Sequence, residues 1–518
     1  MTPLADGAWH RLHPATPLLR GGIALIAIIG IIVTNLRERL VQWFFPAIAC
    51  PPRAPECQGD PVDLIVSNGY ALIALAIVLA LLLVLVALFY VSWRAHTFRV
   101  TGEVVEVRSG VLFRTHRKAR LDRIQGVTIV RPMFARLLGA ARLEVEVAGN
   151  DANVQLAYLG TAASDLLRAD ILRLASGSRA AAGESPAAAG SLLDRRVSEL
   201  LAPELDPLLA APESVVRMHP GRLIGSTLLS GTTVVFLVVA IAVSIGLVLS
   251  ISVSRDFLVL LFTFVPIVLG LGSYLVRRVT RFLRYTIART PDGVRIGYGL
   301  LTTRNDTLPP GRIHSVAVSQ NLLWRPAGWW TVRVNRASRG GPSAGQSAQQ
   351  NTIVLPVGSR ADVLRVLELL LPELMGAAPN SAGGVDLRTL LNNGLVGRGG
   401  HDEFTGSPRR AVVLRWFSWR RNGFALFPGA VLLRKGAIWR ELAIVPTPRM
   451  QSVAIEQGPI ERALRLAAVH VHTVAGPISP RLGALDARDA EAFFRDAELA
   501  AVTAGGSEGT HRWRSGEN

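Results

Sequence analysis

The stretch LDRIQGVTIVRPMFARLLGAARLEV, residues 121–145, returns twice in altered form along the chain. The related stretches are PGRIHSVAVSQNLLWRPAGWWTV, residues 310–332, and PRMQSVAIEQGPIERALRLAAV, residues 448–469. Each copy has an arginine, a valine four residues after it and a glycine thirteen residues before it. These residues are Arg123, Val127 and Gly110, then Arg312, Val316 and Gly299, then Arg449, Val453 and Gly436. Fixed spacing at three places predicts three structural repeats.

Each repeat has the pattern of antiparallel strands followed by one helix. Alternating apolar residues surround a short turn before each of the three glycines, which predicts a β-hairpin. An amphipathic helix is predicted at the end of each repeat, over residues 162–175, 359–374 and 487–501. This α+β unit of roughly 80–100 residues fits a small β-barrel or sandwich with a helix that closes one end.

Two interpretations apply to the residues that recur. The glycines fit turns that need a positive φ. The arginines Arg123, Arg312 and Arg449 fit either a structural tie from the strand to a neighbouring carboxylate or carbonyl, or a contact to a bound anion.

Four apolar stretches predict a membrane protein. They cover residues 18–36, 70–93, 223–252 and 257–276. Residues 70–93 carry no charge and, at about 1.5 Å per residue, are long enough to cross a bilayer. We therefore predict two transmembrane helix pairs, with a signal peptide as the alternative for the first stretch. Arg20, near the start of the first stretch, can reach the membrane interface with its long side chain. Because no other charged residue lies between the ends of these stretches, we interpret them as anchors rather than a transport pathway.

Basic residues set the predicted orientation. Four arginines follow the last apolar stretch, at positions 277, 278, 281 and 284. Positive charge collects on the cytoplasmic side of membrane proteins. We therefore predict a multi-pass protein of the inner (plasma) membrane, with both termini and the three barrels in the cytoplasm.

The motif Arg-x-His-Pro precedes both predicted helix pairs. It contains Arg11 and His13 in the first copy, and Arg217 and His219 in the second. Cationic side chains in this place predict contact with lipid headgroups at the membrane interface.

The third repeat has no helix pair in front of it. A linker leads instead to RWFSWRR, residues 415–421. Its Trp416 and Trp419 are interpreted either as an anchor at the membrane interface or as part of an ordinary strand at the start of a domain.

These features predict the order of segments along the chain. The order is a cytoplasmic N-terminus (1–17), a first helix pair (18–93) with an outer loop (37–69), a first barrel domain (94–176), a linker (177–220), a second helix pair (221–276), a second barrel domain (277–375), a linker (376–407), a third barrel domain (408–503) and a tail predicted to be disordered (504–518).

The two cysteines of the chain, Cys50 and Cys57, fall in the outer loop. There they form a disulfide or remain two free thiols.

Catalytic and metal-binding motifs are absent or lack their structural context. Residues 341–345 spell G-x-S-x-G, but no predicted helix follows, as a nucleophile elbow requires. His470 and His472 share one face of a strand, and two imidazoles are too few for a structural zinc site. The sequence has no P-loop, dinucleotide fingerprint or H-E-x-x-H motif. We therefore predict no catalytic residue, no cofactor and no metal.

The formal charge of +18 is not gathered into runs or a basic tail. Because no helix-turn-helix pattern accompanies this charge, we predict no nucleic-acid partner.

The stretch GVLFRTHRKARLDRIQGVTIVRPMFARLLGAARLEV, residues 110–145, its two later copies and the helix pairs in front resemble the bacterial pleckstrin-homology-like domain of the second type, as found in YdbS/YdbT-like membrane proteins. The resemblance covers most of the chain. It implies seven-stranded barrels with a C-terminal helix and no known catalytic activity. Pleckstrin-homology domains elsewhere bind phosphoinositide headgroups, through basic residues at the first hairpin turn, or proteins. Here the turns read VTGE, TPDG and FPGA, without Lys or Arg at the tip.

Together these features predict a non-enzymatic, membrane-anchored interaction platform that acts in envelope stress or membrane maintenance. The predicted partners are the lipid bilayer, with anionic lipids favoured by the positive charge, and a membrane protein or a second copy of the chain. The alternative function is an accessory subunit of a membrane transport or export assembly. Small residues on the third apolar stretch, such as Ser226 and Ser230, favour that alternative because they allow close helix packing.

Overall fold

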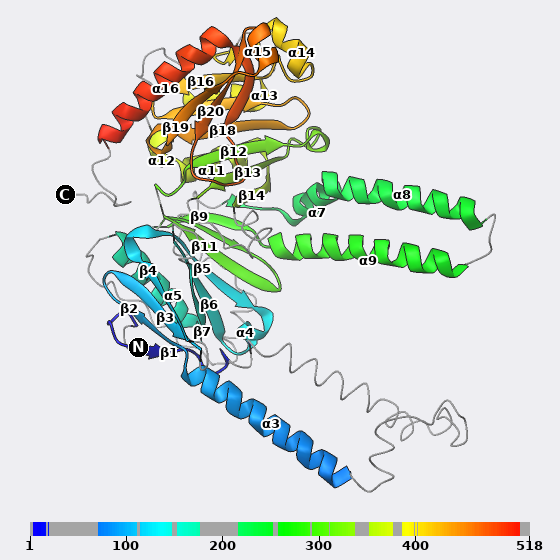
Figure 1. The fold of residues 1–518 in the computed structure, drawn as a ribbon, viewed down its shortest axis with the longest axis vertical. Coiled ribbons are helices and arrows are strands. Elements are labelled where there is room, and N and C mark those ends of the chain that lie inside the picture. The colour runs from blue at the N-terminus through cyan, green and yellow to red at the C-terminus, as the bar shows by residue number, and fades with distance from the viewer. Residues whose placement is uncertain are drawn as a thin grey trace.

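Three repeats follow one another in the computed structural model, and each consists of four strands, three further strands and a helix (Figure 1). We call the four strands the first strand group and the three strands the second strand group. The structure describes residues 4–16, 19, 71–110, 114–147, 153–176, 216–251, 257–290, 293–309, 311–336, 352–376, 386–397, 399–400 and 402–507.

The strands and closing helices occupy equivalent places in the three repeats. The first repeat contains β1 (His10–Arg11), β2 (Thr97–Val100), β3 (Val104–Ser109) and β4 (Thr115–Arg120), then β5 (Ile124–Pro132), β6 (Ala140–Val147) and β7 (Val154–Gly160), and α5 (Thr161–Ser176). The second contains β8 (Val216–Arg217), β9 (Thr286–Thr290), β10 (Gly293–Tyr298) and β11 (Thr302–Leu308), then β12 (Ser315–Gln320), β13 (Trp330–Asn335) and β14 (Ile353–Gly358), and α11 (Arg360–Leu370) with α12 (Pro372–Met375). The third contains β15 (Thr405–Gly406), β16 (Gly423–Phe427), β17 (Ala430–Lys435) and β18 (Arg440–Pro446), then β19 (Ser452–Glu456), β20 (Leu466–His472) and β21 (Arg481–Asp486), and α16 (Ala487–Ser507).

The remaining helices precede or interrupt the repeats. The long ones are α3 (Ala71–Arg94), α7 (Pro220–Leu228), α8 (Gly231–Ile251), α9 (Phe257–Phe282) and α13 (Leu387–Val396). The short ones are η2 (Leu121–Arg123), α4 (Met133–Leu137), η4 (Leu322–Trp324), η6 (Arg409–Ala411), α14 (Val412–Arg415), η7 (Thr447–Arg449) and α15 (Pro459–Ala463).

Strand pairing continues from one repeat into the next. The second strand group of the first repeat joins the first strand group of the second in one seven-stranded sheet, ordered β7-β6-β5-β11-β10-β9-β8. The sheet β14-β13-β12-β18-β17-β16-β15 joins the second and third repeats in the same way. We call these two pairings, β5 with β11 and β12 with β18, the junctions. At the two ends, β1-β2-β3-β4 and β19-β20-β21 form separate smaller sheets.

This pairing corrects the prediction of three closed barrels. The α+β class is right, but none of the sheets formed by the described residues closes into a barrel. A barrel would need β4 to pair with β5, β11 with β12, and β18 with β19 inside their own repeats. β11 and β18 instead pair antiparallel with strands of the preceding repeat. The two strand groups of one repeat contact each other, for example β3 with β7 and β17 with β21, without continuous pairing.

The predicted transmembrane helix pairs are also corrected. Within the described part of the chain, no single helix has both the length and the apolar composition of a membrane span. Pro220–Leu228 and Gly231–Gly246 meet the test only together, as a pair bent by 47°. The bend has a local cause, because the Thr233 hydroxyl donates to the carbonyl of Thr227 at 2.6 Å and Ser230 caps the new helix. Apart from Leu19, residues 18–36 lie outside the described residues, and so do residues 37–69 with the two cysteines.

α7 belongs to the second repeat rather than to a continuous apolar helix. Its Leu223 is 2 % exposed and lies in the core that the second and third repeats share. The indole N–H of Trp324 donates to the carbonyl of Ser226 at 3.2 Å, and Arg222 pairs with Asp362 of α11 at 2.9 Å. These contacts hold the start of the apolar segment against the strands and direct α8 away from them.

Candidate functional site

Three apolar helices project from one side of the repeats (Figure 1). α3 leads into the first repeat, while α8 and α9 lie side by side and lead into the second. α3 ends with Arg94 and α9 has Arg281 in its last turn. On α3, Leu83 and Leu88 are 61 % and 63 % exposed. These helices therefore present apolar surface that the described part of the chain does not cover.

α8 is apolar around its whole circumference. Residues 235–239 read VFLVV, and all five side chains are exposed. Because consecutive helical residues are about 100° apart, five of them surround the helix. A helix of this kind is stable in an apolar environment, either lipid or another apolar protein surface, and not in water.

Exposed apolar turns lie next to the points where the helices join the repeats. The N–H of Leu300 donates to the carbonyl of Thr280 in α9 at 2.9 Å. Arg136 of α4 donates to the carbonyl of Leu300 at 3.2 Å, which places α4 beside this turn. Phe134 on α4 is 59 % exposed. The apolar surface of α9 thus continues onto the turns of the first two repeats.

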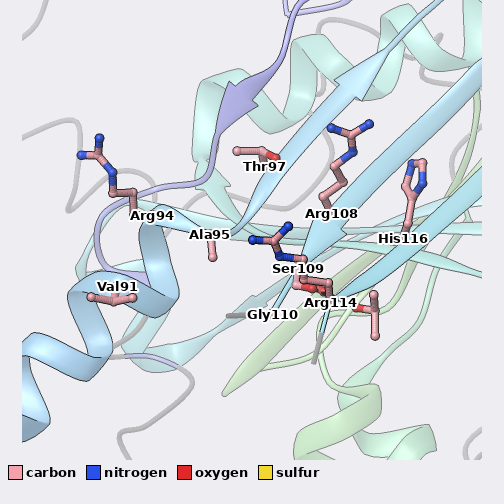
Figure 2. A pocket seen from close by; sticks show the side chains of 10 residues that line it. Val91, Arg94, Ala95, Thr97, Arg108, Ser109, Gly110, Arg114 and His116 are labelled. Carbon is pink, nitrogen blue, oxygen red and sulfur yellow. Dashed lines mark hydrogen bonds between the residues drawn. The ribbon is translucent and has the colours of Figure 1, made fainter. Parts of the chain in front are cut away.

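A cleft of about 560 Å³ opens where α3 joins the first repeat (Figure 2). Its walls are the last turn of α3, the start of β2, the end of β3 and the start of β4. The lining residues are Val91, Arg94, Ala95, Thr97, Arg108, Ser109, Gly110, Arg114, Thr115 and His116. Three arginines and one histidine therefore line the cleft, and no carboxylate does. We call it the basic cleft.

The surroundings of the basic cleft leave its arginines available for an anion. Arg108 lies over the ring of Trp9, with its guanidinium carbon 4.1 Å from the ring centre. The nearby acid, Glu106, is 2 % exposed and accepts hydrogen bonds from Arg99 at 2.6 Å, while Lys118 lies 3.0 Å from it. Burial alone would raise the pKa of Glu106, but Lys118 and Arg99 hold it below its usual value. Glu106 therefore compensates those two cations. It also lies 3.7 Å from His116 of the cleft, but its ion pairs involve none of the three arginines of the lining.

Aromatic side chains fill the corresponding place in the second repeat. When the repeats are aligned on Gly110 and Gly299, Ser109 corresponds to Tyr298. Tyr298 stacks on Tyr285 with ring centres 5.4 Å apart, and Phe282 lies 6.0 Å from Tyr298. A small residue at position 109 therefore leaves open in the first repeat a space that a tyrosine occupies in the second.

Comparison with known families now decides what the repeats are. The family model of the bacterial PH domain matches residues 52–175, 227–374 and 395–499, which is more than half of the chain. The chain belongs to the bacterial PH domain family. It is a multi-PH-domain protein, and PH-like domains are typically non-catalytic interaction modules. A search of the curated proteins finds no match to the chain.

The recurring glycines precede the last strand of each first strand group, and the recurring valines lie on the first strand of each second strand group. The φ angles of Gly110, Gly299 and Gly436 are 99°, 109° and 80°. A Cβ on Gly299 would lie 2.0 Å from the carbonyl oxygen of Thr302, so only glycine fits there. Val127 and Val316 are fully buried within the junctions, whereas Val453 is half-buried.

The recurring arginines differ in their environment. Arg312 donates to the backbone carbonyl of Asp122, in the turn of the preceding repeat, at 2.8 Å. Burial, followed by the positive charge of Arg449, lowers the pKa of Arg312, so these two guanidinium groups lie near each other. Arg123 of the first repeat is exposed. Arg312 thus links its repeat to the turn of the preceding one. The choice between a structural tie and an anion contact stays a prediction for the three arginines.

The Arg-x-His-Pro motif begins each of the first two repeats. Arg11 lies in β1 and Arg217 in β8, and both side chains are exposed. The rings of His13 and His219 each accept a hydrogen bond at 3.2 Å from the backbone N–H two residues later. The motif thus provides a short edge strand and a turn, and its contact with lipid headgroups stays a prediction.

The two predicted tryptophans of the third repeat lie between α14 and β16. Trp416 is 68 % exposed and contacts Phe417, with ring centres 3.8 Å apart and the rings tilted by 38°. Trp419 is half-buried and packs against a small core that includes Leu466. The segment therefore presents one tryptophan outward, but neither one lies on a projecting helix.

Neither histidines nor acids gather into a metal site among the described residues. No group of three or more His, Cys, Asp or Glu side chains with metal-binding geometry occurs there. The rings of His470 and His472 lie 3.9 Å apart on β20, and burial and the neighbouring His472 lower the pKa of His470. Residues 341–345, with the G-x-S-x-G pattern, lie outside the described part of the chain.

The sequence-based search did not select the cationic residues on the strands of the basic cleft. Arg108, Arg114 and His116 come from the end of β3 and the start of β4, on either side of Gly110. The sequence did carry one signal for this cleft: basic residues flank Gly110, and this segment follows the uncharged apolar stretch 70–93. The inspected hairpin tips, by contrast, carry no lysine or arginine.

Proposed function

We propose that this protein is a non-enzymatic, membrane-attached interaction platform whose first PH-like repeat holds the phosphate group of anionic lipids in the basic cleft. The apolar helices α3, α8 and α9 enter the lipid layer and keep the three repeats at its cytoplasmic surface. One observation carries the proposal: a cleft with three arginines and no carboxylate lies at the end of an exposed apolar helix.

The position of the cleft supports a headgroup rather than a free anion. Val91 lines the cleft and is 45 % exposed on the last turns of α3, so an apolar wall continues directly into the basic one. A phosphate bound between Arg94 and Arg114 therefore has an apolar surface beside it for an acyl chain. Arginine is suited to this task because its planar fork donates two parallel hydrogen bonds to phosphate oxygens.

The test uses the full chain in neutral detergent micelles that contain a fluorescent phosphatidylglycerol. The triple variant Arg94→Gln/Arg108→Gln/Arg114→Gln removes the cations of the cleft. A matched control removes three exposed arginines elsewhere: Arg365, Arg488 and Arg495. Each well-placed cation contributes about 1 kcal/mol to the binding of an anionic surface. The cleft variant is therefore expected to bind on the order of 100-fold more weakly, and the control to bind like wild type.

Three other outcomes would speak against the proposal. Equal loss of affinity in both triple variants would show that net charge, and not the cleft, attracts the lipid. Unchanged binding by the cleft variant would leave the cleft without a role in lipid recognition. If inorganic phosphate at millimolar concentration displaced the lipid fully, the cleft would be a site for a free anion, and the apolar wall would be irrelevant to it.

A further inference from the structure

The two junctions inside the chain are built in the same register. Val127 of β5 is opposite Thr307 of β11, and Val316 of β12 is opposite Ile444 of β18. Thr307 and Ile444 each follow the recurring glycine of their own repeat, Gly299 and Gly436, by eight residues. The recurring valine and this position therefore define one junction geometry, which the chain uses twice.

A second contact also recurs at both junctions. Arg136, thirteen residues after Arg123, donates to the carbonyl of Leu300 in the next repeat at 3.2 Å. Arg325, thirteen residues after Arg312, donates to the carbonyl of Ile438 in the next repeat at 3.0 Å. An arginine at one fixed position thus closes each junction beside the paired strands.

A further junction would use the last strand of a first strand group and the first strand of a second strand group. In the described part of the chain, the strands at these places that pair with no other repeat are β4 and β19, at the two ends of the row of repeats. β4 ends the first sheet, and β19 ends the last one. On β4, Arg117 and Lys118 are exposed, whereas Ala443 and Ile444, at the equivalent positions of β18, are no more than 1 % exposed. The contrast arises because β18 has a strand of the preceding repeat beside it, and β4 has none among the described residues.

β19 shows the same contrast at the other end. Val453 is half-buried, although the equivalent Val127 and Val316 are fully buried in their junctions. Arg462, thirteen residues after Arg449, is exposed, although the equivalent arginines of the first two repeats bond across their junctions. The third repeat therefore carries the parts of a junction, with no fourth repeat to complete it.

Charge favours pairing between these two edges over pairing of β4 with itself. β4 carries His116, Arg117, Lys118 and Arg120 and no acid, so two copies of β4 would place cations opposite cations. The one charged residue of β19 is Glu456, which pairs with Arg481 of β21 in its own chain, so β19 brings no cation to face those of β4. Exposed strand edges are sites at which another chain can add. Of the possible pairings, β4 with β19 matches both the internal junctions and the charges.

We propose that the chain assembles head to tail with further copies of itself, by antiparallel pairing of β19 of one copy with β4 of the next. The internal junctions fix the register. Lys118 follows Gly110 by eight residues, so it lies opposite Val453. Ala454 then lies opposite Arg117, and Ile455 opposite His116. Such a contact uses different surfaces on the two copies, so it generates a ring or a filament rather than a two-fold dimer.

The projecting helices are compatible with this assembly. The junction between the first two repeats leaves α3 and the pair α8 and α9 on the same side of the array (Figure 1). The assembly does not depend on lipid recognition, because neither Val453 nor Lys118 lines the basic cleft.

Cysteine cross-linking of the full chain in detergent tests the register. In a background with Cys50→Ser and Cys57→Ser, one tagged population carries a cysteine on β19 and another carries one on β4. Because side chains alternate between faces, Val453→Cys with Lys118→Cys and Ala454→Cys with Arg117→Cys are expected to form disulfide-linked pairs on mild oxidation. The crossed combinations, 453 with 117 and 454 with 118, place the thiols on opposite faces and are expected to link at least tenfold less.

A charge reversal tests whether the pairing drives assembly. We expect wild type to show species larger than one chain by mass photometry, in amounts that rise with concentration. Val453→Lys places a cation opposite Lys118 and is expected to leave single chains. Val453→Glu places an acid opposite Lys118 and leaves the pair of Lys118 with Glu106 in place, so it is expected to form the larger species at least as well as wild type. Leu499→Lys, on the exposed side of α16, is the control and is expected to assemble like wild type.

Three results would overturn the proposal. They are a wild-type chain that stays single at tens of micromolar, larger species that persist unchanged in Val453→Lys, and equal cross-linking in all four cysteine combinations. The triple arginine variant of the basic cleft is expected to cross-link like wild type, so failure of lipid binding and failure of assembly are separately visible.

Discussion

Replacing Arg434 by methionine is expected to loosen the third repeat by several kcal/mol. Arg434 lies on β17, and its side chain is fully buried. Its guanidinium binds both carboxylate oxygens of Asp402, at 2.5 and 3.1 Å. It also donates to the carbonyls of Arg421 at 2.8 Å and Asn393 at 3.1 Å. Four of its five N–H groups thus have partners in the interior.

The magnitude follows from what the variant leaves behind. Methionine occupies much of the same space as arginine. The loss of stability therefore comes mainly from Asp402, whose side chain is 12 % exposed and is left without its partner, and from the two backbone carbonyls that lose their donor. Removing one partner of a buried ion pair costs about 3–5 kcal/mol. Hydrogen–deuterium exchange of the full chain measures this locally. Amides of β17 are expected to exchange roughly 150- to 5,000-fold faster than in wild type, since each 1.4 kcal/mol is a factor of ten.

Two further variants make the reasoning refutable. In Arg434→Met/Asp402→Leu the carboxylate is gone as well, and exchange is expected to return at least halfway to wild type, because an apolar replacement of a whole ion pair is tolerated. Arg488→Met, on the exposed side of α16, is the control for general effects of losing an arginine. Exchange of β17 within threefold of wild type in the single variant would show that the ion pair does not hold this repeat together.

Two other predictions concern the turns and the pH response. Gly436→Ala puts a Cβ 2.0 Å from the carbonyl oxygen of Trp439 at a φ of 80°. The variant is therefore expected to lower the free energy of unfolding by about 1–3 kcal/mol. Gly458→Ala, at a negative φ, is the control, and a similar loss of stability there would refute the argument. Burial, then the charges of Arg449 and Arg312, lowers the pKa of His314 from 6.5 to about 4. The unfolded chain therefore binds this proton first as the pH falls, and stability is lost between about pH 6.5 and 4, by up to about 3 kcal/mol. His314→Asn is expected to flatten that part of the curve of unfolding free energy against pH, and an unchanged curve would exclude this histidine as the cause.

The sequence predicted the repeat and its elements because these depend on local spacing. Strand alternation, helical periodicity and turn glycines are properties of a few neighbouring residues, and the closing helices lie where that periodicity placed them. The partner of a strand is not local. β11 reads TTRNDTL, which has the polarity of an exposed edge, yet Asn305 and Asp306 are 2 % and 4 % exposed at the first junction. The polar composition of β11 therefore gave no sign that β11 pairs with a strand of the preceding repeat, and this pairing is what replaces the closed barrels.

The basic cleft was not predictable for a related reason. Its residues come from α3, β2, β3 and β4. β4 is basic, with His116, Arg117, Lys118 and Arg120, but the sequence does not show that α3 and β3 bring Arg94 and Arg108 to its start. The cleft depends on the absence of a large side chain at Ser109, where the second repeat has Tyr298. Its existence thus follows from packing differences between repeats, which the recurring Gly, Arg and Val positions do not report.

The third repeat differs from the others in a way that explains its buried arginines. Where the first two repeats send apolar helices outward, the third is preceded by α13, whose Leu391 and Leu395 pack into the shared core. A helix that ends inside the protein needs donors for its last carbonyls. Arg421 donates to the carbonyls of Gly394 and Leu395 at 2.8 and 2.9 Å, and Arg434 serves Asn393. Arg421 and Arg434 therefore allow α13 to end inside the protein. For this reason, loss of Arg434 is expected to destabilise the third repeat before the other two.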